Sequence, residues 1–478
     1  MPSPFLGETP TSTALVTEKL NLKTRLAYGF GELAGALPTS ASAFLLLYFL
    51  TRVAGLNPTL AGGAMLFGKV WDAFSDPLVG WLSDRTRSPL GRRYPWMLGA
   101  AIPLGVCCIL QWVTPPTNNQ WALFAYYSTV SVLAYAAFSS VMVPFSALAA
   151  ELTQGYNERI TLISFKSTFS IGGSIFALFV AQIIFERIAN PRRAYVLLGI
   201  IIGLLVVLAV GVCVLGTYWR YRTIRIHHPQ IAVATSQSLV NQIRIVTSNR
   251  PFRQVIGLYL FSWTGVQISA VILPYFVVDW MGLPEPHFIR MALTVQGTAV
   301  ASMFGWNWIG RKTGKRAIYF MGVPLAIGAQ LGLFLLQPGQ TELMYAIGMV
   351  AGLGIATVYL VPWSMLPDVV DFDELTSGQR REGIFYGFVV FLQKIGIALA
   401  IFLTGKILDW AGLITTGAGD TMVIQQPDSA LWAIRLIMGF LPILSLAGGL
   451  IFAYYYPITR EVHAEILLKL KQLTPSHH

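Results

Sequence analysis

Apolar stretches of about 20 residues alternate along the chain with short polar connections. A helix of that length crosses the hydrocarbon core of a bilayer, where an open strand would leave its backbone polar groups unsatisfied. The pattern therefore predicts an all-α membrane protein. We expect twelve transmembrane helices, at residues 27–51, 60–82, 96–115, 121–149, 163–186, 194–219, 253–280, 288–310, 317–336, 343–366, 384–407 and 431–457.

The longest polar connection inside this series divides the spans six and six. The predicted organisation is an N-terminal cytoplasmic segment (1–26), a six-helix half (27–219), a central cytoplasmic loop (220–252), a second six-helix half (253–457) and a cytoplasmic tail (458–478). Apolar residues recur at helical spacing in the tail, which predicts a short helix at the membrane surface.

An internal repeat supports the division into halves. Val-Pro-Phe-Ser at 143–146 ends the fourth span, and Val-Pro-Trp-Ser at 361–364 ends the tenth, 218 residues later. Gly-Arg-Arg at 91–93 and Gly-Lys-Arg at 314–316 are separated by 223 residues. Two parallel six-helix halves with a midplane site between them resemble the major facilitator architecture.

Composition excludes a soluble domain and a disordered chain, because 55% of the residues are hydrophobic, 12% are charged and the mean hydropathy is +0.61. The formal net charge of +11 follows from topology and needs no nucleic-acid partner. Of the 33 Lys and Arg residues, 23 fall on the side of the N-terminus, 6 on the opposite side and 4 inside apolar segments. This is the positive-inside bias, and it predicts a multi-pass cell-membrane protein with both termini in the cytoplasm.

The second span carries three charged residues, Lys69, Asp72 and Asp76, at helical spacing on one face. Each charge at the bilayer centre costs about 2.5–3.5 kcal/mol, so all three need partners or water. Two carboxylates four residues apart form an oxygen-rich site for a monovalent cation or a shared proton. The alternative is a salt bridge between Lys69 and Asp72 that only holds helices together, which leaves Asp76 unexplained.

Charged residues also gather on the predicted cytoplasmic face. The loop from Gly80 to Arg93 resembles the signature loop of the major facilitator superfamily, and an acidic cluster follows the tenth span. We expect these residues to pair across the halves as an inner gate. The alternatives are a basic loop that serves topology alone and a solvated acidic loop. The predicted gating residues are Asp84, Arg85, Arg92, Arg93, Asp368 and Asp371.

Five segments together resemble the glycoside-pentoside-hexuronide:cation symporters, the melibiose-carrier family. They are the sequence WDAFSDP at 71–77, the arginine-rich loop, residues 143–146, the acidic segment 368–374 with 380–383, and the tail segment 457–465. The resemblance runs from about residue 20 to residue 470. The animal relatives of this family include the sodium-dependent lysophospholipid transporter.

The resemblance implies a role for several residues. It implies a cation site at Asp72 and Asp76, with further oxygens from Ser75 and Ser139. It places Lys166, Lys394 and Tyr359 in the substrate site, to which we also assign Lys69.

The chain departs from the melibiose carrier where that protein holds galactoside hydroxyls. Two sugar-binding carboxylates are replaced by Ala36 and Met142, and a stacking tryptophan by Ser146. Glu32 lies one helical turn before Ala36. It either substitutes for a lost carboxylate or is a buried acid paired with a lysine.

We therefore predict a symporter of a small polar organic solute, a sugar or glycoside, working by alternating access as a monomer in the bilayer. The coupling cation is Na⁺ or H⁺, with Li⁺ as a further candidate, and no cofactor is expected. A sodium-coupled lysophospholipid transporter is the alternative within this class. A membrane-embedded enzyme acting on lipid is the alternative from another class, and the chain carries neither an HExxH nor a GxSxG motif.

Overall fold

The computed structural model describes residues 20–153, 156–227, 239–379, 381–415 and 425–473. Residues 1–19 of the predicted N-terminal segment, 228–238 of the central loop, Arg380 and residues 474–478 of the tail lie outside this description. Within the described ranges every regular element is a helix and there is no strand. The prediction of an all-α protein is confirmed.

The N-terminal half consists of long helices joined by short turns. Asparagines cap several starts: Asn57 accepts backbone N–H groups at the start of α4, and Asn119 does so at the start of α6. The first rod combines α1 (Leu22–Gly31), α2 (Leu33–Ala41), the π-helical turn η1 (Ser42–Leu46) and α3 (Leu47–Arg52). The others are α4 (Pro58–Arg85), α5 (Tyr94–Leu110), α6 (Gln120–Leu152), α7 (Tyr156–Arg187) and α8 (Pro191–His227).

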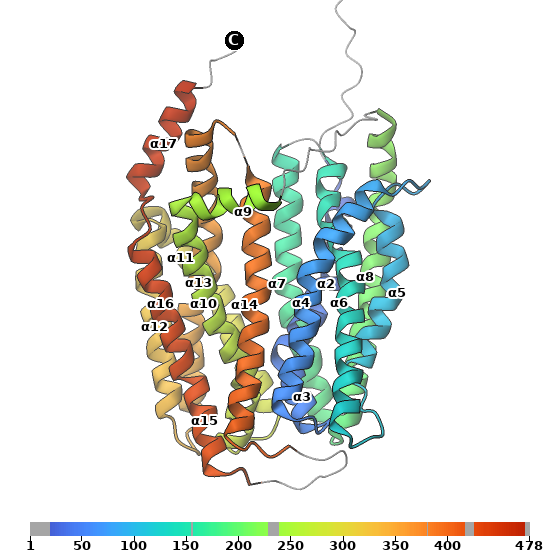
Figure 1. The fold of residues 1–478 in the computed structure, drawn as a ribbon, viewed down its shortest axis with the longest axis vertical. Helices are drawn as coiled ribbons and strands as arrows, with labels where there is room; N and C mark the ends of the chain where they lie inside the picture. Colours follow the sequence, from blue (N-terminus) through green and yellow to red (C-terminus); the bar gives the residue numbers. More distant parts are fainter. Residues whose placement is uncertain (1–19, 154–155, 228–238, 380, 416–424, 474–478) are drawn as a thin grey trace, which may run out of the picture.

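The C-terminal half lies beside the first as a second bundle, yellow to red in Figure 1. A short helix, α9 (Leu239–Ser248), precedes it and crosses its surface, and α17 (Arg460–Leu473) follows it. The bundle contains α10 (Arg250–Tyr275) continued by η2 (Phe276–Trp280), α11 (Pro286–Thr313), α12 (Lys315–Leu335), α13 (Thr341–Ser377), α14 (Glu382–Trp410), and α15 (Asp428–Met438) with α16 (Phe440–Tyr454).

Nine helices among the described residues are long and apolar enough to cross a membrane. Helices α4 and α11 are long but fall outside this set, and α5 is apolar but shorter. Helix α4 carries Lys69, Asp72, Asp76, Asp84 and Arg85, which lower its hydropathy. The count of twelve spans therefore stays a prediction.

The structure corrects one boundary that bears on function. We expected the tenth span to end at residue 366 and the acidic cluster to lie in a loop. Instead α13 continues to Ser377 through Pro362 and Pro367, so Asp368 and Asp371 lie on its last turns. A fixed helix spacing of three residues then turns these two carboxylates to one side. The tail forms α17, the helix that its apolar spacing predicts.

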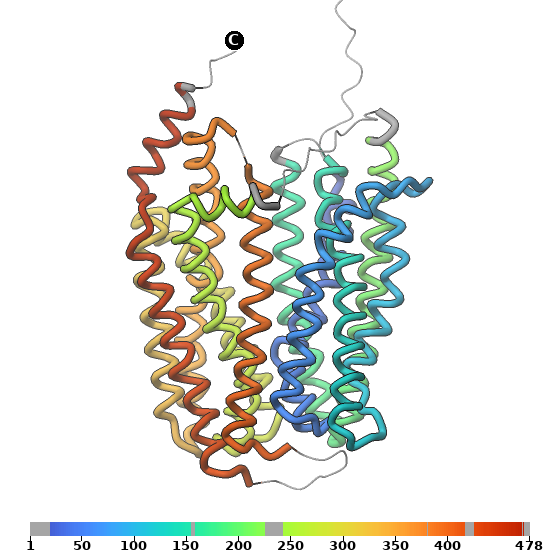
Figure 2. Tube along the Cα trace, in the orientation of Figure 1, coloured from blue at the N-terminus to red at the C-terminus, as the bar shows by residue number. Residues whose placement is uncertain are grey.

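The bundle has two ends, which differ in what connects the helices. We call one the α9 end: it carries α9, α17 and the connections 86–93, 314 and 378–381. The other is the η2 end, with η2 and the connections 53–57, 111–119, 281–285 and 336–340. The trace in Figure 2 shows the helices running between these ends, with the C-terminus at the α9 end.

Candidate functional site

A lysine from one half bridges two acids of the other near the middle of the bundle. Helix α4 presents Asp72, which is almost fully buried, and Asp76, whose side chain is 30% exposed. Lys394 of α14 lies between them, with its Nζ 2.9 Å from Asp72 Oδ1 and 2.6 Å from Asp76 Oδ2. One ammonium group thus partly neutralises two carboxylates, which lowers the free-energy cost of placing them in a low-dielectric interior.

Two serines complete an oxygen cluster around Asp72. Ser139 of α6 donates to Asp72 Oδ1 at 3.3 Å, and the hydroxyls of Ser75 and Ser139 are 2.6 Å apart. The helices approach closely because a Cβ at Gly68 would lie 2.7 Å from Ser131 Cβ. Carboxylate and hydroxyl oxygens are ligands for a hard cation. We call Asp72, Ser75, Asp76, Ser139 and Lys394 the acid-pair site.

Lys69 takes a different partner from the one considered in the sequence. Its ammonium lies over the ring of Tyr135 on α6, 4.5 Å from the ring centroid. The ion pair of Asp72 is made by Lys394. A salt bridge between Lys69 and Asp72 is therefore wrong as the explanation for the burial of Asp72. Lys394, which we assigned to the substrate site, instead contacts both Asp72 and Asp76.

The N-terminal half brings together three of the predicted substrate residues. Lys166 of α7 donates to Ser146 Oγ at 3.0 Å, and its Nζ lies 3.7 Å from Glu32 Oε2. Glu32 sits at the junction of α1 and α2 and is buried. Of the two hypotheses for Glu32, the structure matches the buried acid that pairs with a lysine. The side chain of that lysine, Lys166, is partly exposed.

Met142 has a packing role in this structure. A Cβ at Gly35 of α2 would lie only 2.6 Å from Met142 Cε, so the thioether fills the space that the glycine leaves. Ser146, one turn further along α6, is exposed. The structure thus separates Met142, which faces a helix, from Ser146, which faces Lys166.

Tyr359 belongs to an aromatic group in the C-terminal half that we did not predict. Its ring lies 5.1 Å from that of Trp263, edge to face, and Tyr259 stacks on Trp263 at 5.8 Å. Trp363 contacts Tyr259 at 5.7 Å. The Trp263 indole N–H is buried without a hydrogen-bond partner among the described residues. The sequence signal was available, because 259 and 263, and 359 and 363, are each one helical turn apart.

The η2 end is tied together by contacts between the two halves. Arg52 at the end of α3 pairs with Asp279 of η2 at 2.6 Å, and both side chains are buried. The hydroxyls of Thr51 and Tyr275 are 2.6 Å apart. None of these residues was selected from the sequence, since a charge at a span end is ordinary there.

Further contacts join the two halves at this end. Asp409 of α14 accepts from Asn57 and Thr59 at the start of α4, each at 2.7 Å. Glu285, in the connection before α11, interacts electrostatically with Tyr48 of α3. Burial raises the pKa of Glu285 to about 7, because a carboxylate out of water favours its neutral form.

At the α9 end the predicted gate residues pair within their own half. Arg92 and Arg93 of the 86–93 connection both contact Glu151 of α6, at 2.7 and 3.1 Å from their Nε atoms. Arg93 also pairs with Asp84. Arg85 lies over the ring of Trp81, 3.8 Å from its centroid.

The C-terminal half repeats this arrangement. Lys315, just after Gly314, pairs with Asp368 of α13 at 2.7 Å, and His463 of α17 lies 3.1 Å from Asp371. Glu151 and Asp368 are 217 residues apart, one less than the internal repeat, so the repeat could have identified Glu151. Among the described residues, Arg92, Arg93 and Asp368 form none of the cross-half pairs that we predicted, because residues of the same half pair with them.

Comparison with known proteins agrees with this architecture. A family model described as "MFS/sugar transport protein" matches residues 27–460. An uncharacterized symporter from Synechocystis is 40% identical over 98% of this chain and 100% of its own length. A sodium-dependent lysophosphatidylcholine symporter from Danio rerio is 26% identical over 92% of this chain and 87% of its own length.

Two further matches extend the comparison. A protein of Escherichia coli that carries the name glycoside/cation symporter, YagG, is 27% identical over 92% of this chain and 93% of its own length. The crystal structure of the nucleoside transporter NupG superposes with a TM-score of 0.62 over 92% of this chain and all of that chain, at 13% identity. At that identity the likeness concerns the fold alone.

Proposed function

We propose that this chain, which belongs to the MFS/sugar transport protein family, is a cation-coupled symporter of a small polar organic solute, most simply a sugar or glycoside. The observation that carries the proposal is the acid-pair site. Lys394 of one half holds Asp72 and Asp76 of the other at 2.9 and 2.6 Å. The site is therefore an ion site and also a joint between the halves.

A monovalent cation and the Lys394 ammonium compete for the same oxygens in this proposal. When the cation binds between Asp72 and Asp76, it takes over the charge that Lys394 neutralises, and Lys394 is released from α4. The strength of the joint then depends on the cation. A ligand shifts a conformational equilibrium only by its difference in affinity between the states, and this competition supplies such a difference.

The contacts at the two ends indicate which state is described. The η2 end is closed by cross-half pairs such as Arg52–Asp279, whereas the ion pairs described for Arg92, Arg93 and Lys315 join residues of one half. We take this as a state open toward the α9 end. The excess of basic residues at that end supports a cytoplasmic location for it, and in this proposal the state is inward-facing.

The substrate side is proposed from two groups of residues. Glu32, Lys166 and Ser146 offer a carboxylate, an ammonium and a hydroxyl to sugar hydroxyls. Tyr359 and Trp263 offer aromatic faces and an unpaired indole N–H. One polar group and one aromatic group suit a pyranose ring, which presents hydroxyls at its edge and C–H groups on its faces.

A lysophospholipid is the second candidate. The relative from Danio rerio is named for that substrate, and Lys166 is partly exposed and able to meet a phosphate. Sodium, proton and lithium remain candidates for the coupling ion.

The test is uptake by purified protein in proteoliposomes. We expect an inward gradient of Na⁺, Li⁺ or H⁺ to drive accumulation of at least one labelled glycoside, and a choline gradient to drive none. A labelled lysophosphatidylcholine measured in parallel separates the two substrates. Equal uptake with and without every cation gradient, for both classes, would contradict cation coupling.

A further inference from the structure

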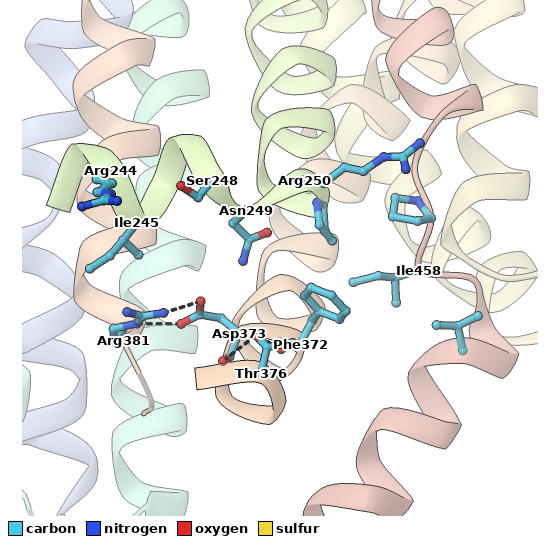
Figure 3. A pocket seen from close by; sticks show the side chains of 13 residues that line it. Arg244, Ile245, Ser248, Asn249, Arg250, Phe372, Asp373, Thr376, Arg381 and Ile458 are labelled. Atoms are coloured by element: carbon cyan, nitrogen blue, oxygen red, sulfur yellow. Dashed lines mark hydrogen bonds and ion pairs between the residues drawn. The ribbon is translucent and has the colours of Figure 1, made fainter. Parts of the chain in front are cut away.

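A cavity at the α9 end lies outside the acid-pair site, where α9 and the tail meet the C-terminal bundle. Its volume is about 640 Å³. It is open to one side and is lined by α9, the first turn of α10, the last turns of α13, Arg381, the connection between α16 and α17 and the start of α17. Figure 3 shows Arg244 and Arg250 at its upper rim, with Asp373 and Arg381 below them.

The charges around the cavity are unbalanced. Arg381 holds Asp373 through two hydrogen bonds, at 2.8 and 2.7 Å, so this acid is already satisfied and buried. Arg244 and Arg250 also line the cavity, both are exposed, and no acid among the described residues pairs with either. Two guanidinium groups without an acidic partner among the described residues thus line one cavity, and an anion bound there would offset their positive charge.

The rest of the lining is suited to a group attached to an apolar or neutral body. Ile245, Phe372 and Ile458 contribute apolar surface beneath the arginines. Arg250 is the first residue of α10, and the apolar span 250–280 begins there. The cavity therefore lies where the apolar part of the bundle gives way to polar connections, the level at which lipid phosphates lie.

We propose that this cavity binds a phosphate group, held by the guanidinium groups of Arg244 and Arg250. A guanidinium donates two parallel hydrogen bonds to phosphate, which distinguishes it from a lysine at such a position. Arg381 stays with Asp373 and fixes the floor. The source of the phosphate is either the headgroup of an anionic phospholipid or a small soluble phosphate ester. The site does not depend on which solute the protein transports.

The position of the site gives its occupancy a structural consequence. Arg244 lies on α9, which follows the connection between the halves, and the floor residue Arg381 immediately precedes α14, the helix that carries Lys394. A phosphate would fasten α9 to α10 over the end of α13. Binding should therefore stabilise the C-terminal half against heat.

The test measures binding to the full-length purified protein in neutral detergent. The probes are dioctanoyl phosphatidylglycerol, dioctanoylglycerol and glycerol 3-phosphate, which give chains with phosphate, chains alone and phosphate alone. We expect phosphatidylglycerol to bind and to raise the melting temperature, and dioctanoylglycerol to do neither. Affinity for glycerol 3-phosphate comparable to that for the lipid assigns the site to soluble esters, and weaker affinity assigns it to lipid.

The variants separate this cavity from general electrostatics. Arg244→Gln with Arg250→Gln should weaken phosphate binding at least about tenfold. The matched control is Arg253→Gln with Arg311→Gln, which removes two exposed arginines of the same half that do not line the cavity. The control should change the affinity by less than about twofold.

A third variant keeps both arginines. Thr376→Glu places a carboxylate at an exposed position in the lining, and it should weaken binding as the double variant does. Equal losses in the pocket double variant and the control double variant, or full binding by Thr376→Glu, would overturn the proposal.

Discussion

The two ends of the interface between the halves use similar residues in opposite ways. At the η2 end Arg52 reaches across to Asp279, and Asp409 reaches across to Asn57 and Thr59. At the α9 end Arg93 pairs with Glu151 and Lys315 pairs with Asp368, in each case an acid of the same half. Among the described residues, the contacts named here join the two halves at the η2 end, whereas those at the α9 end stay within one half.

This difference between the two ends suggests how such a transporter could change from closure at the η2 end to closure at the α9 end. Arg92, Arg93 and Lys315 at the α9 end already have acidic partners, so closing that end requires these three residues to exchange partners. Opening the η2 end instead separates a buried ion pair, so the larger barrier in this state lies at the η2 end.

The largest effect is expected at the acid-pair site, which lies between the two ends of the bundle. Asp72→Asn and Asp76→Asn should each abolish cation-driven accumulation, because the cation loses a charged ligand and Lys394 loses a partner. We expect a fall of at least about a hundredfold in uptake in proteoliposomes, which corresponds to roughly 2.7 kcal/mol. Normal uphill uptake in either variant would remove the acid-pair site from the mechanism.

Lys394→Ala tests the same site from the C-terminal half, which contributes the ammonium group. Removing the ammonium abolishes coupling between the halves but frees both carboxylates for the cation. Transport should therefore fall at least about tenfold, while thermal stabilisation by the coupling cation is retained or increased. Loss of that stabilisation would mean that Lys394 helps to form the cation site rather than competing for it.

Asp279→Asn should open the η2 end. Removing one partner of a buried pair leaves Arg52 as an uncompensated charge, which costs about 3–5 kcal/mol in the closed state. Spin labels at Asn118 and Gln337, which are exposed at this end on opposite halves, should report longer distances.

The control for this variant is Arg52→Gln combined with Asp279→Asn, which removes both charges and should recover most of the wild-type distances. A distance distribution in Asp279→Asn that matches wild type, in correctly folded protein, would show that other contacts close this end.

Glu285 should make closure of the η2 end depend on pH. Its pKa is about 7 when buried and 4.5 ordinarily, so the closed state keeps a proton that an open state loses. Closure is unaffected below pH 4.5, weakens as the pH rises toward 7, and is weakened above pH 7 by about 3 kcal/mol. The titratable groups that interact electrostatically with Glu285 are Tyr48 and Tyr195.

The measurement is the distance between the labels at 118 and 337 from pH 5 to pH 8. The wild-type protein should shift toward longer distances as the pH rises. Glu285→Gln, which stays neutral, should remove most of the shift, and an unchanged shift in that variant would assign the pH dependence to another group.

The smallest effect is expected at the α9 end. Asp371→Asn with Arg92→Gln should raise the population open at this end, since pairs that form only on closing are lost. Exposed ion pairs contribute about 0–1 kcal/mol each, so the change should stay below about tenfold. Labels at Leu90 and Thr313 report it, and a shift as large as that of Asp279→Asn would contradict the contrast between the ends.

The class of protein, its helical architecture and the shared helix face of Lys69, Asp72 and Asp76 could be predicted from the amino-acid sequence. The length of the apolar stretches requires helices in a bilayer, and the spacing of Lys69, Asp72 and Asp76 requires a shared face, because both follow from the geometry of a single helix. The repeat likewise indicated the two halves. These features need no knowledge of how one helix docks on another.

Which side chains of different helices contact one another became known only from the tertiary structure. Lys394 lies 322 residues from Asp72, and its position between Asp72 and Asp76 depends on how α14 packs against α4. Glu151 rather than Asp368 pairs with Arg93 for the same reason, as does Trp263 with Tyr359. Helical periodicity orders residues along one rod, whereas contacts between rods are set by side-chain packing over the whole interface, which no local pattern encodes.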